Sequence, residues 1–356
     1  MKKISILIPD GESPFAYHVL NCLADVDDVE VHILSAAANA LARYSRATKS
    51  FHLLKKGQRP VDGVAEVCAK VQVDLCMPVG ADGVYYFAQH REETEKTTNL
   101  LLMESADNLD NIGDKAKFAE LLRAHRLPHP HSITSRAQLD LEIQNLTFPV
   151  LVKPRGGGGG EGIDKCEYSE ALIARVDSQE NFFEEYLIQE YVEGEDVDCS
   201  TFCRDGKILA YTMQKGLYVD PDSYLPAQGI EFVHHPGVFE VASKLVSTLK
   251  WNGIAHVDTR IRSTDGSIDI IEINTRFWGS LEGSFHAGVN FPYVACLASL
   301  GREVPMQTYR NTRYMSAFTA LRRIFKRKPI VNFFKETNLG LHLKDPLPVI
   351  MRLVSS

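Results

Sequence analysis

Short apolar runs alternate with amphipathic stretches over the first third of the chain. The runs have the character of buried strands, and the stretches between them place apolar residues at helical spacing. Strands and helices that alternate in this way build a parallel sheet with helices on its faces. We therefore expect strands at 3–8, 30–35 and 73–78 and helices at 14–25 and about 60–70.

A further helix is expected to begin at Asp114. Apolar residues at helical spacing follow Asp114 until two prolines end the stretch, so Asp114 is the expected N-cap or first-turn acid. Lys115 then lies in the first helical turn, where the helix dipole disfavours a cation unless an anion compensates it. Downstream, the patterns predict helices at 169–177, 179–187 and 237–250 and two strands within 197–213.

Five consecutive glycines, Gly156 to Gly160, come shortly after an apolar strand that ends in Lys153. Glycine has no Cβ to keep backbone N–H groups away from an anion, and the lysine adds a point charge to the same place. The Gly-Lys-Ser/Thr sequence of a P-loop does not follow the glycines. The pattern indicates a phosphate-binding loop. A flexible glycine linker is the alternative, although such a linker is not normally fused to a strand that ends in lysine.

Residues 253–280 have the pattern of two strands joined by a turn at 264–266. On the second strand Glu272, Asn274 and Arg276 recur at period two, so they project from one face. Carboxylate and amide oxygens are ligands that Mg²⁺ accepts when it also binds phosphates. The strand pair is therefore a candidate magnesium site, with a charged surface ribbon as the alternative.

Asp258, on the first of these strands, joins the same face only in one register. A two-residue Asp-Gly turn would place Asp258 opposite Ile273 and point it away from Glu272. We therefore predict a bulged hairpin or a three-residue turn, with Asp258 opposite Glu272 or Asn274.

Composition narrows the classes of function. The chain has 356 residues, enough for two or three domains, and its formal charge of -7 argues against nucleic acid as a partner. No apolar run reaches the length of a membrane span, and the seven scattered cysteines form no C-x-x-C pair, so we expect reduced thiols and a cytoplasmic location. The basic stretch 322–328 is expected to be a solvated helix face, with contact to an anionic membrane as the alternative.

The motif Lys153-Pro-Arg-Gly-Gly-Gly-Gly-Gly-Glu-Gly resembles the glycine loop of the ATP-grasp superfamily, most closely biotin carboxylase and the carbamoyl phosphate synthetase large subunit. Glu272-Ile-Asn-Thr-Arg276 is similar to the superfamily's magnesium strand. The resemblance implies an α/β (α+β grasp) architecture in which a Rossmann-like parallel-sheet domain precedes an ATP-grasp fold of two α+β subdomains. The implied boundaries are 1–100 for the first domain, 101–300 for the ATP-grasp domain with its lid at about 131–188, and 301–356 for a C-terminal extension.

The resemblance also implies which residues bind ATP. Lysines and the glycine loop would contact the phosphates, a hinge would hold adenine, and an acidic residue would bind the ribose. These residues are Lys115, Lys153, Gly156, Gly157, Gly158, Gly159, Gly160, Glu190, Tyr191, Val192, Asp196 and Lys215. Glu195 competes with Asp196 for the ribose, and Lys117 is the weaker alternative to Lys115.

In the same way Asp258, Glu272 and Asn274 are implied as ligands of two Mg²⁺ ions, with Mn²⁺ as an alternative ion. Arg276 and Lys153 would be catalytic, Arg276 by steadying the transferred phosphate or the acyl intermediate. Ser280 and His286 lie on a loop that would line the acceptor side of the cleft.

The implied reaction is ATP-dependent ligation of a small-molecule carboxylate to an amine through an acylphosphate, with release of ADP and phosphate. A homodimer is compatible with the resemblance. Three alternatives stay open at this point: a biotin-type carboxylase, a small-molecule kinase of grasp fold, and a non-catalytic ATP-binding protein. The identities of the acid and the amine are not legible in the sequence.

Overall fold

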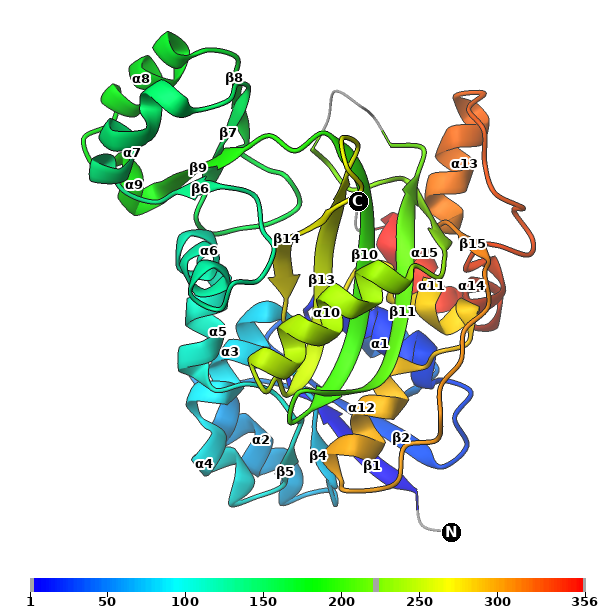
Figure 1. Cartoon of the computed structure of the whole chain (residues 1–356). Helices are drawn as coiled ribbons and strands as arrows, with labels where there is room; N and C mark the ends of the chain where they lie inside the picture. The colour runs from blue at the N-terminus through cyan, green and yellow to red at the C-terminus, as the bar shows by residue number, and fades with distance from the viewer. Residues whose placement is uncertain (1–2, 220–223, 355–356) are drawn as a thin grey trace.

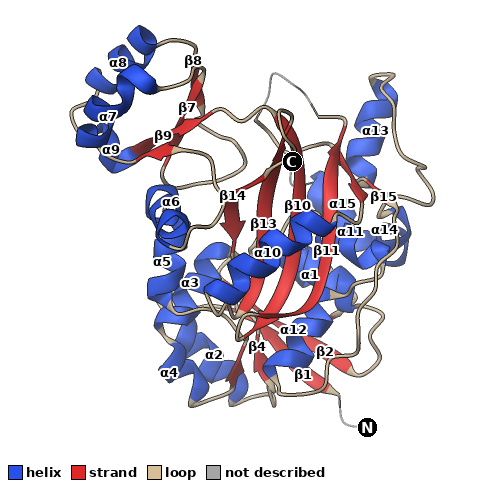
Figure 2. Ribbon diagram, in the orientation of Figure 1, coloured by secondary structure: helices blue, strands red, loops and turns tan. Residues whose placement is uncertain are grey.

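The computed structural model describes residues 3–219 and 224–354 and arranges them around three β-sheets (Figure 1). The expected boundaries at residues 1 and 356 lie just outside the described residues. A parallel sheet lies at one end of the molecule, a large antiparallel sheet in the middle, and a small antiparallel sheet forms a projecting lid (Figure 2).

The N-terminal sheet has five strands in the order β3-β2-β1-β4-β5, and all its pairings are parallel. Its elements are β1 (Ile4–Ile8), α1 (Pro14–Leu23), β2 (Val29–Ser35), the 3-10 helix η1 (Leu41–Tyr44), β3 (Thr48–Leu53), α2 (Pro60–Cys68), β4 (Leu75–Cys76), α3 (Ala81–Gln89), α4 (Arg91–Glu95) and β5 (Asn99–Leu100). The prediction of a parallel sheet is confirmed. Strand β3 was not predicted, because it is a half-exposed edge strand without an apolar run.

The lid sheet is antiparallel, in the order β6-β9-β7-β8. Its elements are β6 (Ser132–Ile133), α7 (Arg136–Glu142), the 3-10 helix η2 (Ile143–Asn145), β7 (Val150–Pro154), β8 (Asp164–Cys166), α8 (Ser169–Asp177), α9 (Phe182–Glu185) and β9 (Tyr186–Glu190). The helix expected at 179–187 is confirmed only at Phe182–Glu185 and is wrong at both ends. The chain turns into β9 at Tyr186 because Leu187 and Ile188 are needed in the sheet, where Ile188 joins the lid's own core.

The large sheet runs β14-β13-β10-β11-β12-β15 and is antiparallel throughout. Helix α10 lies across its front in Figure 1, and α12 packs against β10 and β11. The elements are α5 (Ala106–Gly113), α6 (Lys115–Ala124), β10 (Gly194–Arg204), β11 (Lys207–Leu217), β12 (Gly229–Phe232), α10 (Pro236–Thr248), β13 (Gly253–Arg262), β14 (Ile268–Asn274), α11 (Leu281–Ala287), α12 (Phe291–Ser299) and β15 (Arg313–Tyr314). One continuous apolar core joins this sheet to the N-terminal sheet.

The C-terminal extension adds α13 (Ala317–Phe325), α14 (Leu339–Lys344) and α15 (Pro346–Val354). Within the basic stretch 322–328, Arg323 is buried and donates to the Pro329 carbonyl, whereas Phe325 is 86% exposed. The stretch is therefore not the uniformly solvated face that was expected, and membrane contact stays a hypothesis. Among the helices of the described residues, none is both long and apolar enough to cross a bilayer.

A buried carboxylate ties the extension to the rest of the molecule. Glu282, at the start of α11, is 1% exposed and accepts hydrogen bonds from Asn21 of α1 (2.6 Å), Tyr314 of β15 (2.9 Å) and Asn338 (2.6 Å). The His18 ring lies 3.0 Å away. Burial alone would raise the pKa of Glu282, but the charge of His18 and the hydrogen bonds outweigh it and lower the pKa to about 2.

Replacing Glu282 with alanine is expected to lower the free energy of unfolding by about 3–5 kcal/mol, because several buried polar groups lose their common acceptor. Urea denaturation followed by circular dichroism measures this loss. Glu93, which is exposed and pairs with Arg59, is the matched control. We expect Glu93→Ala to cost less than about 1 kcal/mol. Equal effects of the two substitutions would contradict the role of Glu282.

Candidate functional site

The candidate site lies where the lid meets the large sheet. A small cavity of about 20 Å³ is lined there by Lys115 of α6, Lys153 of β7, Gln189 of β9 and Glu272 of β14. Two of the predicted phosphate contacts and one predicted metal ligand therefore converge on one place. Glu272 lies more than a hundred residues after both lysines in the sequence, so only the fold brings them together.

Lys153 is held by the lid strands. Its side chain is buried, and its Nζ donates to Gln189 Oε1 at 2.7 Å, while the Gln189 amide donates in turn to Ser132 Oγ. Burial lowers the pKa of Lys153 to about 8. Gln189 was not predicted, because a single polar residue in an apolar strand carries no motif. Its hydrogen bond aims the Lys153 ammonium at the boundary between lid and sheet.

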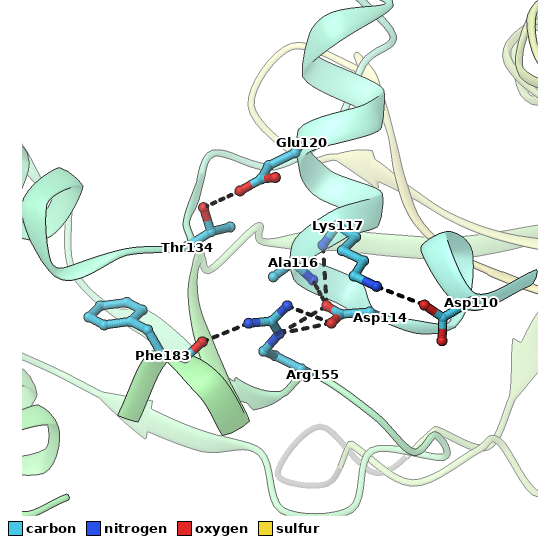
Figure 3. Close-up of polar contacts among 8 residues, drawn as sticks. All are labelled: Asp110, Asp114, Ala116, Lys117, Glu120, Thr134, Arg155 and Phe183. Atoms are coloured by element: carbon cyan, nitrogen blue, oxygen red, sulfur yellow. Dashed lines mark hydrogen bonds and ion pairs between the residues drawn. The ribbon is translucent and has the colours of Figure 1, made fainter. Parts of the chain in front are cut away.

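The start of helix α6, whose Asp114 cap is drawn in Figure 3, positions a second lysine. As predicted, Asp114 caps this helix by accepting from the backbone N–H groups of residues 116 and 117. Arg155, just before the glycine loop, donates to the Asp114 carboxylate at 2.5 and 3.0 Å. Lys117 turns away and pairs with Asp110, whereas Lys115 Nζ donates to the Gly157 carbonyl at 2.6 Å. Of the two lysines, Lys115 is therefore the one at the site.

The glycine loop is open where a ligand would need room. A Cβ built at Gly156, Gly157, Gly158 or Gly159 meets no atom within 4 Å. Gly157 also has a φ of +78°, a backbone conformation that other residues rarely adopt. Gly160 differs, because a Cβ there would lie 2.0 Å from the Tyr224 carbonyl oxygen. The loop therefore has open space at Gly156 to Gly159 and packs closely against Tyr224 at Gly160.

The carboxylate hairpin has the predicted bulge. Asp258 pairs with Glu272 and Thr259 with Ile270, so Ile271 is the extra residue. The Arg262 N–H donates to the Ser267 carbonyl, which makes the connection four residues long rather than three. Without a bulge, the register set by this connection would pair Asp258 with Ile271. The bulge shifts the pairing by one residue, so Asp258 lies opposite Glu272. The prediction of a bulge with Asp258 opposite Glu272 is confirmed.

The oxygen donors of this hairpin suit a divalent cation. Asn274 Nδ2 lies 3.1 Å from Glu272 Oε1 and 3.4 Å from Asp258 Oδ2, so the three side chains gather on one face. Asp258 Oδ1 is buried and has no hydrogen-bond partner in the described part of the chain. Burial, together with the charges of Asp198 and Glu272, raises the pKa of Asp258. A bound Mg²⁺ would satisfy that oxygen and favour the ionised carboxylate.

Arg276 borders the site on the side of the N-terminal domain. Its guanidinium donates to Asn274 Oδ1 at 3.2 Å and to the Phe277 carbonyl, and it lies 4.6 Å from the centre of the Phe15 ring. Ser280 donates to Gln214 Oε1 on β11. The His286 ring is half-buried, 3.4 Å from Thr312 Oγ1. Arg276 is therefore fixed beside the predicted metal ligands, between them and helix α1.

The residues predicted to bind adenine and ribose differ in the contacts that their side chains make. Val192 is buried, and the Lys165 ammonium lies over the Tyr191 ring. The Glu190 carboxylate forms an ion pair with Arg262 of β13, and the Glu190 backbone N–H donates to the His131 carbonyl. Asp196 lies 3.2 Å from Arg260, a basic residue that sequence analysis did not single out.

The register corrects the expectation for Lys215. Asp198 pairs with Gln214, so Gln214 shares the carboxylate face. Lys215 pairs with Val197 on the opposite face of the sheet and forms an ion pair with Glu195 at 3.4 Å. The structure therefore does not bring Lys215 to the other lysines, and it places Asp196 rather than Glu195 on the face of the site.

Lysines on a lid and a helix face carboxylates on a large antiparallel sheet, and this arrangement suits a nucleotide whose phosphates would lie between the two parts. Residues 112–280 match the family model of the ATP-grasp domain. The chain thus contains an ATP-grasp domain, as the sequence motifs predicted.

Known proteins resemble the chain over different lengths. A carbamoyl phosphate synthase arginine-specific large chain from Geobacillus stearothermophilus is 26% identical over 185 residues, which are 49% of this chain but 17% of that protein. A D-alanine--D-alanine ligase from Clostridium perfringens (strain SM101 / Type A) is 29% identical over 181 residues, 47% of this chain and 59% of the ligase. The matches therefore span less than two thirds of either enzyme.

The fold is also similar to a solved structure. The biotin carboxylase domain dimer of Hydrogenobacter thermophilus 2-oxoglutarate carboxylase, in complex with MgADP, ADP and bicarbonate, matches with a TM-score of 0.63 at 15% identity. The match covers 86% of this chain and 71% of that one. The match over most of the chain confirms the predicted fold class, an N-terminal parallel sheet followed by two antiparallel sheets.

Proposed function

We propose that this protein is an ATP-dependent ligase that activates a small-molecule carboxylate as an acylphosphate and joins it to an amine, releasing ADP and phosphate. The observation that carries the proposal is the convergence of Lys115, Lys153 and Glu272 on one cavity between lid and sheet. The carbamoyl phosphate synthase and D-alanine--D-alanine ligase relatives support this type of chemistry.

The described residues divide the work. Lys115, Lys153 and the N–H groups of the glycine loop bind the ATP phosphates and neutralise the charge that develops on phosphoryl transfer. Asp258, Glu272 and Asn274 hold Mg²⁺, which polarises the phosphoryl oxygens when bound. Arg276 orients the substrate carboxylate at the γ-phosphate and steadies the acylphosphate. The lid excludes water, which would otherwise hydrolyse the acylphosphate.

A cytoplasmic location and a homodimeric assembly belong to the same proposal. All seven cysteines are free, and most are buried, which suits a reducing compartment. The assembly is supported by the similarity to the biotin carboxylase domain, which was solved as a dimer.

The test is phosphate release from ATP and Mg²⁺ against pooled amino acids, dipeptides and small carboxylic acids. Release of ADP and phosphate that needs one acid together with one amine is the expected result, and splitting the pools then names both substrates. ADP without free phosphate would identify a kinase instead. Turnover that needs bicarbonate but no amine would identify a carboxylase, and tight ATP binding without turnover in any pool would contradict the ligase proposal.

The ribose contact gives a second test of the ATP site. Asp196→Asn is expected to raise the KM for ATP about 10- to 100-fold with little change in kcat, because a charged acceptor of ribose hydroxyls is lost. Glu195→Gln is the matched control and should leave the KM within about twofold, since Glu195 lies on the opposite face of β10. Steady-state kinetics with varied ATP separates the two residues, and the reverse pattern would assign the ribose to Glu195.

A further inference from the structure

A second group of potential metal ligands adjoins the carboxylate hairpin. Asp198 of β10 and two residues of β13, His256 and Asp258, offer ligand atoms that all lie within 4.8 Å of one another. Residues 256 and 258 share a face of β13 because they are two apart. Asp198 lies between the cross-strand pairs Asp196–Arg260 and Cys199–Val257, so it faces Asp258 directly. The three side chains therefore converge from two neighbouring strands.

The imidazole of His256 is held in a fixed orientation. It is 8% exposed, and its ring stacks on Trp278 with centroids 5.3 Å apart and planes 10° from parallel. Its Nδ1 lies 2.7 Å from Ser200 Oγ. In the tautomer whose Nδ1–H donates to Ser200 Oγ, Nε2 presents its lone pair, which is the arrangement found in metal-binding histidines.

One atom of this group, Asp258 Oδ1, lacks a hydrogen-bond partner among the described residues. His256 Nε2 lies 3.3 Å from this buried oxygen. Asp198, Asp258 and Glu272 also follow one another across three adjacent strands. Three neighbouring carboxylates repel one another unless a cation lies between them.

We propose that Asp198, His256 and Asp258 bind a divalent first-row transition-metal ion such as Mn²⁺, distinct from the magnesium position at Glu272 and Asn274 and sharing Asp258 with it. Mg²⁺ prefers oxygen ligands alone, whereas an imidazole nitrogen favours transition metals. The binding of this ion follows from the residues themselves, but its part in catalysis rests on the proposed function.

The position of the group indicates where the ion would act. Along β13, Arg260 lies toward the hinge, and His256 lies two residues beyond Asp258 in the other direction, against Trp278. Trp278 lies in the loop that leads from β14 to Ser280 and helix α11. The ion therefore lies on the acceptor side of the magnesium ligands, where it is placed to bind the substrate carboxylate rather than the nucleotide.

Pulsed electron paramagnetic resonance of the full-length protein with Mn²⁺ and ADP tests the inference. A directly bound imidazole produces a ¹⁴N coupling to Mn²⁺, and growth with ¹⁵N-histidine must change that coupling, which separates it from adenine nitrogens. This measurement on the wild type needs no variant to fold. We expect the coupling to vanish in His256→Asn, which keeps a hydrogen-bonding group near Ser200, and to persist in His131→Asn, a control on the exposed lid surface.

Two further variants address the supporting residues. Ser200→Ala frees the imidazole ring and is expected to weaken Mn²⁺ binding roughly 10- to 100-fold, and Asp198→Asn by a similar factor or more. The inference would be overturned if the nitrogen coupling did not change on histidine labelling, or if bound Mn²⁺ showed no nitrogen coupling. It would also be overturned if the protein did not bind Mn²⁺. The turnover assay tests the ligase proposal separately. Histidine coupling without turnover would support the metal site and contradict the ligase proposal. Turnover without histidine coupling would support the ligase proposal and contradict the metal site.

Discussion

Glu272→Gln is expected to lower ATP-dependent phosphate release by about 10³-fold or more, the largest effect of any substitution considered. The change keeps the shape of the side chain but removes a negative charge from the centre of the magnesium site. Glu272 faces Asp258 across the hairpin, lies 3.1 Å from the Asn274 amide and lies 3.9 Å from Lys115. The substitution therefore affects both the binding of Mg²⁺ and the contact with Lys115. A coupled phosphate-release assay at saturating ATP measures the loss.

Glu240→Gln is the matched control for this prediction. Glu240 lies exposed on α10, the helix that covers the other face of the large sheet, and the substitution removes the same charge. The control should retain wild-type activity, and both variants should unfold at nearly the same temperature as the wild type. If Glu272→Gln keeps more than about a tenth of the activity, the carboxylate does not hold a catalytic metal and the proposed reaction fails.

Lys153→Met is expected to lower kcat/KM for ATP by about 10²- to 10³-fold, because a preorganised cation at the phosphates is lost. The same residue predicts a pH dependence. Burial lowers the pKa of Lys153 to about 8 from an ordinary 10.5, so in the free enzyme the ammonium is lost as the pH rises through 8. We expect kcat/KM for ATP to fall above that pH in the wild type and to show no such limb in Lys153→Met.

The free energy of unfolding should rise with pH above 8, whereas kcat/KM for ATP falls. Between pH 8 and 10.5 the unfolded chain holds the Lys153 proton while the folded protein has released it. The free energy of unfolding contributed by this group therefore rises with pH across that window. Lys117→Met is the control, because Lys117 is exposed and pairs with Asp110 away from the cavity. Equal pH profiles for the two variants would contradict the assignment of Lys153.

Local chemistry explains which parts of the site could be predicted. The cap at Asp114 and the face shared by Glu272 and Asn274 follow from spacing alone. The bulge at Ile271 was predictable because Asp258 had to reach that face, which only one class of register allows. The five glycines indicated an anion-binding loop because few other functions require so many positions without a side chain.

The remaining site residues depend on pairings that no local pattern encodes. Gln189 and Asp198 each resemble an isolated polar residue in a strand, and only β7 and β13, far away in the sequence, give them partners. Lys215 was misplaced because a lysine at the end of a strand can lie on either face, and the β10–β11 register decides which. The helix expected at 179–187 is limited to Phe182–Glu185, and it ends there because the following residues pair with β7 in the lid sheet, which outweighs local helix propensity.

The shared acceptor Glu282 has a consequence for the order in which a nascent chain matures. Its hydrogen-bond donors come from residue 21 at one end of the sequence and from residues 314 and 338 at the other. On the ribosome, helix α1 emerges long before Asn338, so the Glu282 carboxylate has an incomplete set of donors until residue 338 has emerged. The loop that leads from β14 into Glu282 should thus acquire its final conformation only after Asn338 has emerged, and truncations before residue 338 should destabilise the packing around helix α1.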